Sequence, residues 1–369
     1  MKKAAGATNV TLAQIAANLG VHRSTVSICL GSSERAEKFS PALRTRIQDE
    51  AQRLSYRPNF FASQLRKGEK KVVLLGIGHI RDPHAGEIAE SFVQSMEAQG
   101  FQTMLTSFYE KKIQELDSLR SMLGPNSINS ICMITSALDW APKGWIDELV
   151  DEDVHVALIG RHSKRSEILQ VYCDEEESGR LAARHLHECG YLQLGIVCDT
   201  LDRNHALYPR LTGFLSEAAK LQLKQPRVFE VGSPGKLIAD GSQSSIASQV
   251  DVLMQLDGIF ATRDVLAYAV IQNLQRRGKI IAEEVGVLGH GDLFTSQLWN
   301  PPLSTIRQPM KRMGAAAAEM LFENLSTKLA VPPRVFETVL IQRSSTRRAD
   351  GPHDPYGVHP KSRTTLEER

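Results

Sequence analysis

The chain has 369 residues, of which 42% are hydrophobic and 23% charged, and its formal net charge is +2. This is the composition of a globular protein of two or three domains, and it excludes a disordered chain, a collagen-like repeat and a coiled coil. The longest apolar stretch, around Val72–Ile77, is too short to span a membrane. Five scattered cysteines without a CxxC pair favour neither a disulfide framework nor a zinc ribbon. Since no secretory signal is recognisable, we expect a cytoplasmic protein.

The charge is distributed unevenly along the chain. Residues 1–71 contain 13 Lys+Arg and 5 Asp+Glu, a net charge of +8, whereas the remainder contains 31 basic and 37 acidic residues, a net charge of −6. A small basic head on a mildly acidic body indicates that the head meets a polyanion such as nucleic acid. The alternative is a basic surface that is merely solvated.

The sequence of the head predicts three short helices around a small core. Thr11 and Gln14 fit a capping box at the start of the first helix, and Gly20 ends it. A second helix follows within two or three residues, as in a helix-turn-helix unit. Ser40 and Pro41 open the third helix as N-cap and first helical residue. The residues expected to face the core are Leu12, Ile15, Ala16, Leu19, Val26, Leu30, Leu43, Ile47, Ala51 and Leu54.

The outer face of the second helix carries side chains suited to DNA. Arg23, Ser24, Ser27 and Ile28 lie on the side away from the predicted core. Arginine can form a fork on guanine, serine can bond a base or a phosphate, and isoleucine can pack on a thymine methyl group. The alternative is that these residues only solvate the helix, because an isolated helix-turn-helix pattern can be a packing coincidence.

A short apolar segment follows the third helix. Pro58 disfavours helix at the residue before it, and Asn59 can cap a segment over residues 60–65 that is followed by Arg66 and Lys67. Isolated helices under ~12 residues rarely persist in water, so we expect this hinge to order only against another surface.

From Val72 onward, strands alternate with helices. Such a pattern implies parallel sheets covered on both faces, and its two successive runs imply two lobes with a cleft between them. Ligands of open α/β sheets bind at the carboxyl ends of the strands, so the cleft is the expected site. The predicted strands are residues 72–77, 101–106, 131–135, 154–159, 194–197, 258–261 and 285–288, and a helix is predicted over residues 88–96.

The sequence resembles the lactose-repressor (LacI) family of bacterial transcription regulators. In the head, the resemblance is carried by residues 10–16, Gly20-Val21, Thr25-Val26-Ser27, Tyr56-Arg57-Pro58-Asn59, Ala62 and Leu65-Arg66. In the body, it is carried by Gly190-Tyr191, residues 210–214, residues 260–264, Gly289-His290-Gly291-Asp292, residues 301–309 and residues 343–346.

The resemblance implies how the head meets DNA. The helix over residues 23–30 would enter the major groove, and the hinge helix would lie in the minor groove with Leu65 as a wedge between base steps. A homodimer on a near-palindromic operator is expected, because one such head reads few base pairs. We predict that base preference is set by Arg23, Ser24 and Ile28, that phosphates are held by Thr11, Thr25 and Ser27, and that the hinge contacts DNA through Asn59, Ala62 and Leu65.

The resemblance also implies a two-lobed α/β effector domain of periplasmic-binding-protein architecture, so the expected fold is an all-α head joined to that body. The expected divisions are residues 1–57 for the helix-turn-helix head, 58–71 for the hinge and linker, and 72–348 for the effector-binding and dimerisation domain. Within that domain, lobe 1 is expected at about 72–170 and 293–330, and lobe 2 at about 171–292 and 331–348. Residues 349–369 are expected to be a disordered tail, because the last twenty residues match nothing in the family pattern, and they lack the leucine heptads that a tetramerising tail would need.

Several positions depart from the family pattern. In the head, His22 replaces the serine that caps the recognition helix, Ile28 stands where arginine is common, and Gly31 replaces asparagine. In the cleft, Arg263 replaces an asparagine, while Gly160 and Gly291 replace aspartates.

The cleft departures favour an anionic effector, such as a sugar acid or sugar phosphate, because arginine grips carboxylate or phosphate through a planar fork. Arg161, Arg210 and Arg263 are expected to converge on this effector as unpaired cations. His84 and Asp292 complete the predicted effector-binding set. The departures leave a second reading open, in which effector binding has degenerated.

Catalytic signals are weak. No nucleophile–base constellation, P-loop or metal motif occurs, and neither a cofactor nor a metal is expected. The acidic run over residues 174–177 is interpreted as a solvated helix start. A ligand-responsive DNA-binding repressor is therefore the leading function. The alternatives are an α/β sugar- or nucleotide-handling enzyme with an accessory DNA-binding head, and a solute-binding protein, which would need export.

Overall fold

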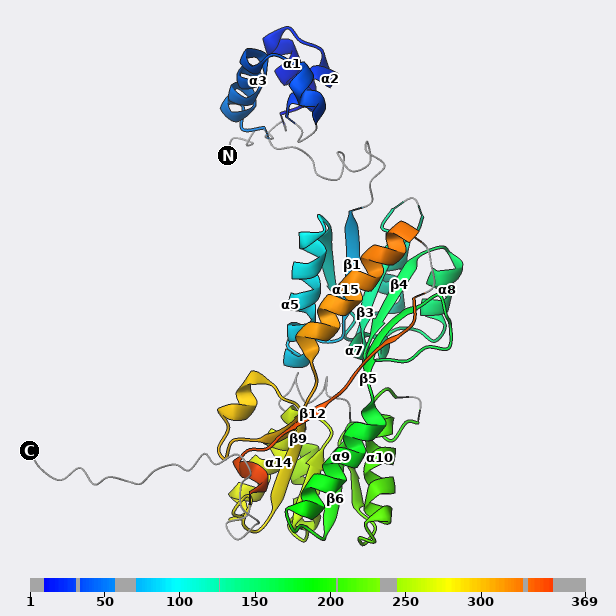
Figure 1. The fold of residues 1–369 in the computed structure, drawn as a ribbon, viewed down its shortest axis with the longest axis vertical. Coiled ribbons are helices and arrows are strands. Elements are labelled where there is room, and N and C mark those ends of the chain that lie inside the picture. Colours follow the sequence, from blue (N-terminus) through cyan, green and yellow to red (C-terminus); the bar gives the residue numbers. More distant parts are fainter. Residues whose placement is uncertain are drawn as a thin grey trace, which may run out of the picture. The chain divides into compact units, whose positions relative to one another are not determined.

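The computed structural model describes residues 10–30, 34–56, 71–125, 127–203, 205–232, 244–327 and 331–347. The chain divides into two compact units, Met1–Lys70 and Lys71–Arg369, called here the head and the body (Figure 1). The predicted hinge helix with Asn59, Ala62 and Leu65, as well as Gly31 and the predicted tail, lies outside the described residues.

The head contains helices where the sequence predicts them: α1 (Leu12–Leu19), α2 (Arg23–Cys29) and α3 (Pro41–Arg53). Thr11 and Gln14 form the capping box, and Gly20 ends α1 in the left-handed conformation with φ 65°. Ile15, Val26 and Ile47 are fully buried at the centre of the core. The four predicted core leucines other than Leu12 are only partly buried, because they lie at the rim of so small a core: Leu19, Leu30, Leu43 and Leu54. A 3₁₀ turn, η1 (Glu34–Lys38), was not predicted.

Lobe 1 of the body is a parallel sheet with helices on both faces. Its strands are β1 (Val72–Ile77), β2 (Gln102–Ser107), β3 (Ser130–Ile134), β4 (His155–Ile159), β5 (Leu169–Cys173) and β11 (Arg334–Phe336), in the order β11-β5-β4-β3-β1-β2. One face packs against α5 (Pro83–Ala98) and α15 (Met310–Thr327), and the other against α6 (Ile113–Ser121), α7 (Thr135–Leu138) and α8 (Trp145–Asp151). Val73 and Leu75 face the first layer and Leu74 the second, which is why β1 is a continuous apolar run.

Lobe 2 repeats this plan. Its strands are β6 (Leu194–Cys198), β7 (Arg227–Glu230), β8 (Gly258–Ala261), β9 (Gly286–Gly291), β10 (Ser304–Arg307) and β12 (Val339–Ile341), in the order β12-β10-β9-β8-β6-β7. All pairs are parallel except β10 with β12. One face packs against α9 (Glu175–Glu188) and α10 (Tyr208–Lys220), and the other against α12 (Ser244–Ala247), α13 (Val250–Leu253) and α14 (Asp264–Arg276). The short 3₁₀ turns are η2 (Phe294–Gln297) and η3 (Ser344–Thr346).

The chain crosses between the lobes after β5, after β10, and between β11 and β12. Side chains tie the three crossings together: Gln308 Nε2 donates to Glu175 Oε1 at 2.8 Å, and Ser178 Oγ lies 3.0 Å from Thr338 Oγ1. The three crossing segments lie close together between the lobes in Figure 1.

The predicted lobe boundaries are therefore corrected. Residues 171–173 and β11 belong to lobe 1, whereas β10 belongs to lobe 2. A strand's residues show that it is buried, but they do not show which sheet its backbone joins. The pairing of β11 with β5 and of β10 with β9 decides this, and both pairings join strands distant in sequence.

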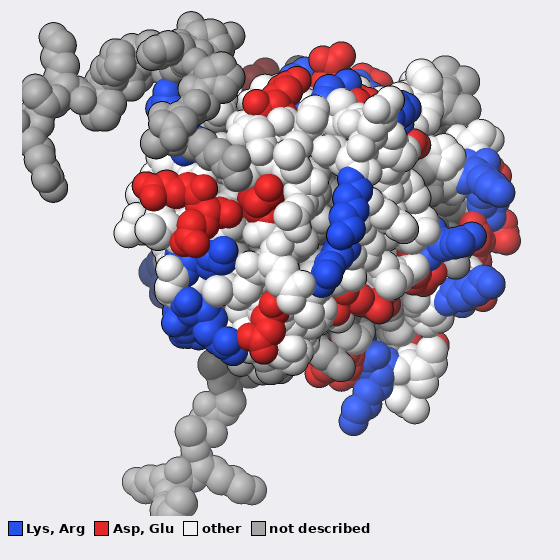
Figure 2. All heavy atoms as spheres, turned by 90° about the horizontal axis from the view of Figure 1, so that it is seen from below, with Lys and Arg blue, Asp and Glu red and all other residues white. Residues whose placement is uncertain are grey.

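Among the described residues, no helix combines the length and apolar character that crossing a bilayer requires. Figure 2 shows the end of lobe 2 that lies lowest in Figure 1, where acidic and basic side chains are interspersed with uncharged surface. The described side chains on this face do not form a continuous basic patch of the kind that binds nucleic acid.

Candidate functional site

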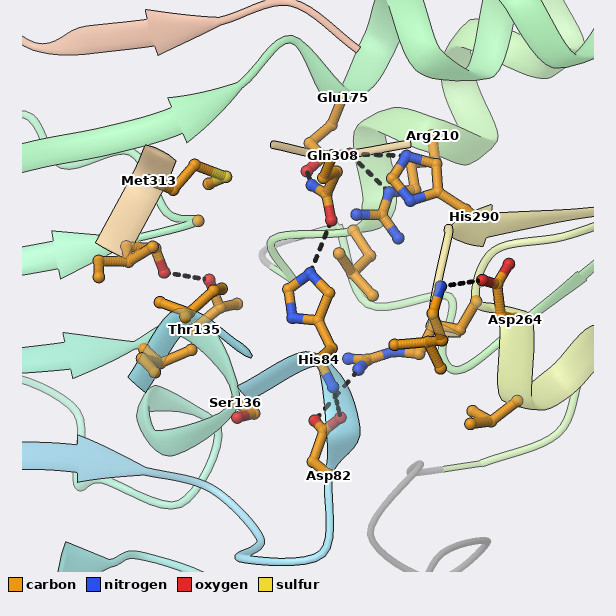
Figure 3. Close-up of a pocket in the computed structure, with 18 residues that line it drawn as sticks. Asp82, His84, Thr135, Ser136, Glu175, Arg210, Asp264, His290, Gln308 and Met313 are labelled. Carbon is orange, nitrogen blue, oxygen red and sulfur yellow. Dashed lines mark hydrogen bonds and ion pairs between the residues drawn. The ribbon is translucent and has the colours of Figure 1, made fainter. Parts of the chain in front are cut away.

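A small cavity lies between the lobes at the carboxyl ends of the strands (Figure 3). Its volume is about 50 Å³. A water molecule occupies ≈ 30 Å³ in the liquid, whereas small-molecule sites commonly measure ≈ 300–1,000 Å³. The cavity is lined by Asp82, His84, Ile88, Ile134, Thr135, Ser136, Ile159, Gly160, Glu175, Leu207, Arg210, Arg263, Asp264, Val265, His290, Leu293, Gln308 and Met313.

Lobe 1 contributes polar groups that its own backbone positions. The Asp82 carboxylate caps α5 and accepts a hydrogen bond from the His84 amide at 3.1 Å. Thr135 donates its hydroxyl to the carbonyl of Ile159 at 2.7 Å, and the Ser136 hydroxyl accepts from a backbone amide. These side chains are held at the strand ends before any ligand arrives.

A continuous polar chain runs from lobe 1 through two of the crossings into lobe 2. His84 Nε2 lies 2.7 Å from Gln308 Oε1, and Gln308 Nε2 donates to Glu175 Oε1. Arg210 then donates from Nε to Glu175 Oε2 at 2.5 Å and from Nη1 to the carbonyl of Thr262. Figure 3 shows Gln308 at the centre of this chain. The Arg210 side chain is 4% exposed and that of Glu175 9%, so this is a buried ion pair.

Close helix packing sets the position of that pair. Glu175 begins α9 and Arg210 lies in the first turn of α10. The helices touch at Gly179 and Gly213, where an added Cβ would overlap the backbone of the opposite helix. Only glycine permits this approach, which brings the carboxylate within reach of the guanidinium.

Arg263 links the lobes directly. Its Nε donates to Asp199 Oδ2 in lobe 2 at 2.8 Å, and its Nη1 lies 3.7 Å from Asp82 Oδ2 in lobe 1. Burial opposes the charged form of Arg263, but attraction to nearby carboxylates outweighs it and raises the pKa of the guanidinium. These carboxylates are Asp199, Asp82 and Asp139.

Burial drives the other titratable groups toward their neutral forms. It lowers the pKa of His84 and, aided by the Arg210 charge, holds the pKa of His290 well below its usual range. Burial also raises the pKa of Asp264, although Thr305, Ser296 and the Leu293 amide donate hydrogen bonds to its carboxylate. The cavity thus combines neutral imidazoles with arginines that already have acidic partners.

The structure brings together only part of the predicted effector-binding set. His84, Arg210 and Arg263 line the cavity, whereas Arg161 and Asp292 do not. Arg161 lies 3.8 Å from the Asp139 carboxylate. Asp292 instead accepts hydrogen bonds from two arginines, Arg307 and Arg343, at 2.6 and 2.7 Å.

The expectation of three unpaired arginines is wrong, because each has a carboxylate partner. Glu175, interpreted from the sequence as part of a solvated helix start, is one of these partners. Asp82 and Asp199 were missed, although sequence signals existed. Asp82 precedes Pro83 at a helix start, and Asp199 directly follows a buried strand.

The backbone at the two glycines that replace family aspartates would not accept an aspartate side chain without strain. Gly160 has φ 82°, and a Cβ there would overlap Thr135 Oγ1. Gly291 has φ 129°, and its Cβ would stand 3.7 Å from Asp264 Oδ2. Both positions strain an ordinary L residue, so glycine here follows from backbone conformation as well as from ligand chemistry.

The outer face of α2 is the second candidate site. Arg23 and Ser24 are exposed, and Thr25, Ser27 and Ile28 are half-buried. His22 takes over the capping role, because its Nδ1 accepts from the Ser24 amide at 3.3 Å and lies 2.7 Å from the Ser24 hydroxyl. The Thr11 hydroxyl accepts from the Gln14 amide in the capping box of α1.

Comparison with known proteins covers both units. Residues 183–346 match the periplasmic binding protein-like domain. The chain is 25% identical over 313 residues to the ribose operon repressor of Lactococcus lactis, a match covering 85% of this chain and 90% of that repressor.

Two solved structures show the same fold. The lac repressor dimer bound to operator and the anti-inducer ONPF aligns with TM-score 0.74 and 16% identity, covering 92% of this chain and all of that one. A LacI family regulator from Enterococcus faecium with bound ribose aligns with TM-score 0.64 and 20% identity, covering 75% of this chain and 99% of that one. The chain is thus similar in sequence to a sugar-operon repressor over most of both chains, and it shares the fold of LacI-family regulators of known structure.

Proposed function

We propose that the protein is a sequence-specific DNA-binding transcriptional regulator of the repressor type that acts as a homodimer in the cytoplasm. The observation that carries the proposal is the outer face of α2, which presents Arg23 and Ser24 to solvent on a three-helix head. Arginine on such a face can form a bidentate contact with guanine. The net charge of +8 over residues 1–71 adds general attraction to phosphates.

The proposed DNA contacts are of two kinds, those to base edges and those to the phosphate backbone. Arg23, Ser24 and Ile28 are assigned to base edges, and Thr11, Thr25 and Ser27 to phosphates. Asn59, Ala62 and Leu65 are assigned to the hinge contact with the minor groove. A homodimer is proposed because paired heads read two half-sites with matching symmetry. The relative of known structure is a dimer bound to its operator, which supports this arrangement.

The cleft is proposed to receive a small metabolite that controls DNA affinity. Its cavity offers carboxylates and guanidiniums already paired with one another, together with neutral imidazoles. Such a set suits a neutral hydroxylated molecule better than an anion, because an anion would have to compete with Glu175, Asp199 and Asp82 for the arginines. This replaces the anionic effector expected from the sequence. The ribose-bound regulator supports a sugar-like effector.

Selection of bound DNA from a random pool tests the proposal. The full chain is expected to enrich an inverted repeat, and R23A combined with S24A is expected to lose this enrichment while retaining weak, salt-sensitive binding. The matched control is R46A, which removes a cation from the exposed side of α3 and is expected to weaken binding on every sequence alike. Enrichment without a dyad, or equal enrichment by R23A/S24A, would contradict the proposal.

The enzyme alternative predicts turnover of a sugar or nucleotide. The relative matched along most of its length is a repressor, which supports a non-catalytic body. Incubation of the purified chain with sugars, sugar phosphates and nucleotides, followed by mass spectrometry, is expected to return every compound unchanged. Catalytic conversion that tracks the protein through purification and is lost in R210A would favour the enzyme.

A further inference from the structure

We propose that Arg263 is a built-in occupant of the cleft, whose guanidinium joins carboxylates of the two lobes and holds the lobes together without a small molecule. The inference deepens the proposed function, because it states what an effector must displace. The closure itself is a property of the body and does not depend on DNA binding.

The two carboxylates come from opposite sides of the cleft and are both buried. The Asp82 side chain in lobe 1 is 8% exposed and the Asp199 side chain in lobe 2 is 2% exposed, with Arg263 at 15% between them. Asp199 Oδ1 has no hydrogen-bond partner among the described residues, so its main compensation is the bond from Arg263 to Oδ2. A buried carboxylate with few other partners depends on the cation beside it.

A third carboxylate reinforces this arrangement. Asp139, at the end of α7 in lobe 1, lies close enough to attract the Arg263 charge and also stands 3.3 Å from His205 Nε2 in lobe 2. Arg263 therefore lies among acidic groups of both lobes. Without its charge, these groups would face one another across a low-dielectric cleft and repel.

The side chain also occupies the volume that a ligand needs. With Arg263 in place, the cavity measures about 50 Å³, far below the ≈ 300 Å³ at which small-molecule sites commonly begin. A sugar-sized molecule can enter only when Arg263 withdraws or the lobes separate. Ligand binding and the Arg263 bridge are thus alternatives, and the ligand's affinity is reduced by whatever the bridge contributes.

Hydrogen exchange with mass spectrometry on the full chain tests the bridge. In R263A, exchange is expected to accelerate roughly tenfold to a hundredfold at the cleft surfaces, in α7 and in residues 199–203 and 205–207. The strands β6 and β8 are expected to keep their protection, which shows that the lobe remains folded. The matched control is R165A, which removes an arginine whose carboxylate partners all belong to its own lobe: Asp147, Asp151 and Glu167. It is expected to leave exchange at residues 199–207 unchanged.

Chemical rescue tests whether Arg263 holds the lobes together through its guanidinium or only through its packing. Guanidinium chloride at low millimolar concentration is expected to restore protection in R263A, whereas sodium chloride at equal ionic strength is not. The wild type is expected to respond to neither. Unchanged exchange in R263A, or acceleration that guanidinium does not reverse, would overturn the proposal.

A second variant covers the case in which R263A does not fold. D82N removes only the lobe 1 half of the bridge and leaves the Arg263–Asp199 bond in place. Exchange at the cleft is expected to rise in D82N, and no rise there would also overturn the proposal. These readouts involve no DNA, so a failed operator selection leaves the result on the bridge standing, and the reverse also holds.

Discussion

The outer face of α2 and the cleft between the lobes are both polar surfaces, but they are built in opposite ways. On α2, the side chains are exposed or half-buried, and the bonds made by His22 and Ser24 are local. In the cleft, Arg210 and Glu175 are buried and joined across 35 positions in sequence. The polar groups of an exposed residue are available to bind a partner molecule, whereas a buried charge is already paired with another group of the protein.

The largest effect is expected from breaking the buried pair in the body. R210A leaves the Glu175 carboxylate buried, with Gln308 and His290 as its polar neighbours among the described residues. Loss of one partner of a buried ion pair typically costs ~3–5 kcal/mol, and we expect a loss of that size in the free energy of unfolding of the body. Urea denaturation of the full chain measures it.

The control for this prediction is R184A on the same helix as Glu175. The Arg184 side chain is 39% exposed and pairs with Glu177, so its removal is expected to cost less than ~1 kcal/mol. If R210A and R184A are equally stable, the cleft pair behaves like a surface pair and the contrast between the two regions disappears.

Acid is expected to weaken the body through His185. Burial lowers the pKa of His185 to about 4, and its Nε2 lies 2.9 Å from Thr346 Oγ1. The unfolded chain has an imidazole pKa of ≈ 6.5, so it binds more protons than the folded state between pH 6.5 and 4. Stability is therefore constant above this window and falls as the pH drops through it, by about 3 kcal/mol in all.

Denaturation at several pH values measures this loss. H185Q is expected to flatten the part of the profile that His185 contributes, at the expense of a lower stability at pH 7. A profile that keeps its full slope in H185Q would assign the acid sensitivity to other buried groups, such as His290.

Specificity is expected to change when the exposed face of α2 is altered. I28R replaces a methyl contact by a possible guanine fork, and base-reading contacts are typically worth ~1–3 kcal/mol per half-site. We expect the preferred base to change at one position of each half-site while the stability of the head stays the same. Sequencing of selected DNA shows this directly, and equal weakening on all sequences would show that Ile28 does not read a base.

The smallest effect is expected at the start of α2. H22A removes the side chain that caps the helix, and loss of an N-cap typically costs ~1 kcal/mol. H22S supplies a hydroxyl cap and is expected to restore this stability. Thermal unfolding followed by circular dichroism compares the two variants, and an H22S no more stable than H22A would show that the imidazole does more than cap.

The sequence predicts the head well because the signals there are local. The Thr11–Gln14 capping box and the Ser40–Pro41 start are readable within four residues, and the helices begin where these signals stand. Seven of the twelve described strands of the body are also found to within three residues, since each is a short apolar run, whereas β5, β7, β10, β11 and β12 are not predicted.

The cleft is predicted less well because its chemistry depends on pairing across the fold. The family pattern indicates Arg210 and Arg263, but it does not show that Glu175 and Asp199 would neutralise them. An acidic residue at a helix start has the same local pattern whether it is solvated or buried. Only the approach of α9 and α10 through two glycines decides which occurs.

Because the chain crosses between the lobes, segments of lobe 1 are synthesised both before and after most of lobe 2. Lobe 1 contains every strand from β1 to β5, yet one face of its sheet is covered by α5 alone until α15 emerges from the ribosome. At ≈ 5–20 residues per second, the stretch between Cys173 and Met310 takes roughly 7–30 s to synthesise. During that time the nascent lobe exposes the apolar face that α15 later covers, while lobe 2 can form most of its own sheet. The edge strands β11 of lobe 1 and β12 of lobe 2 both follow α15 in the chain, so neither sheet is complete until these last strands have been made.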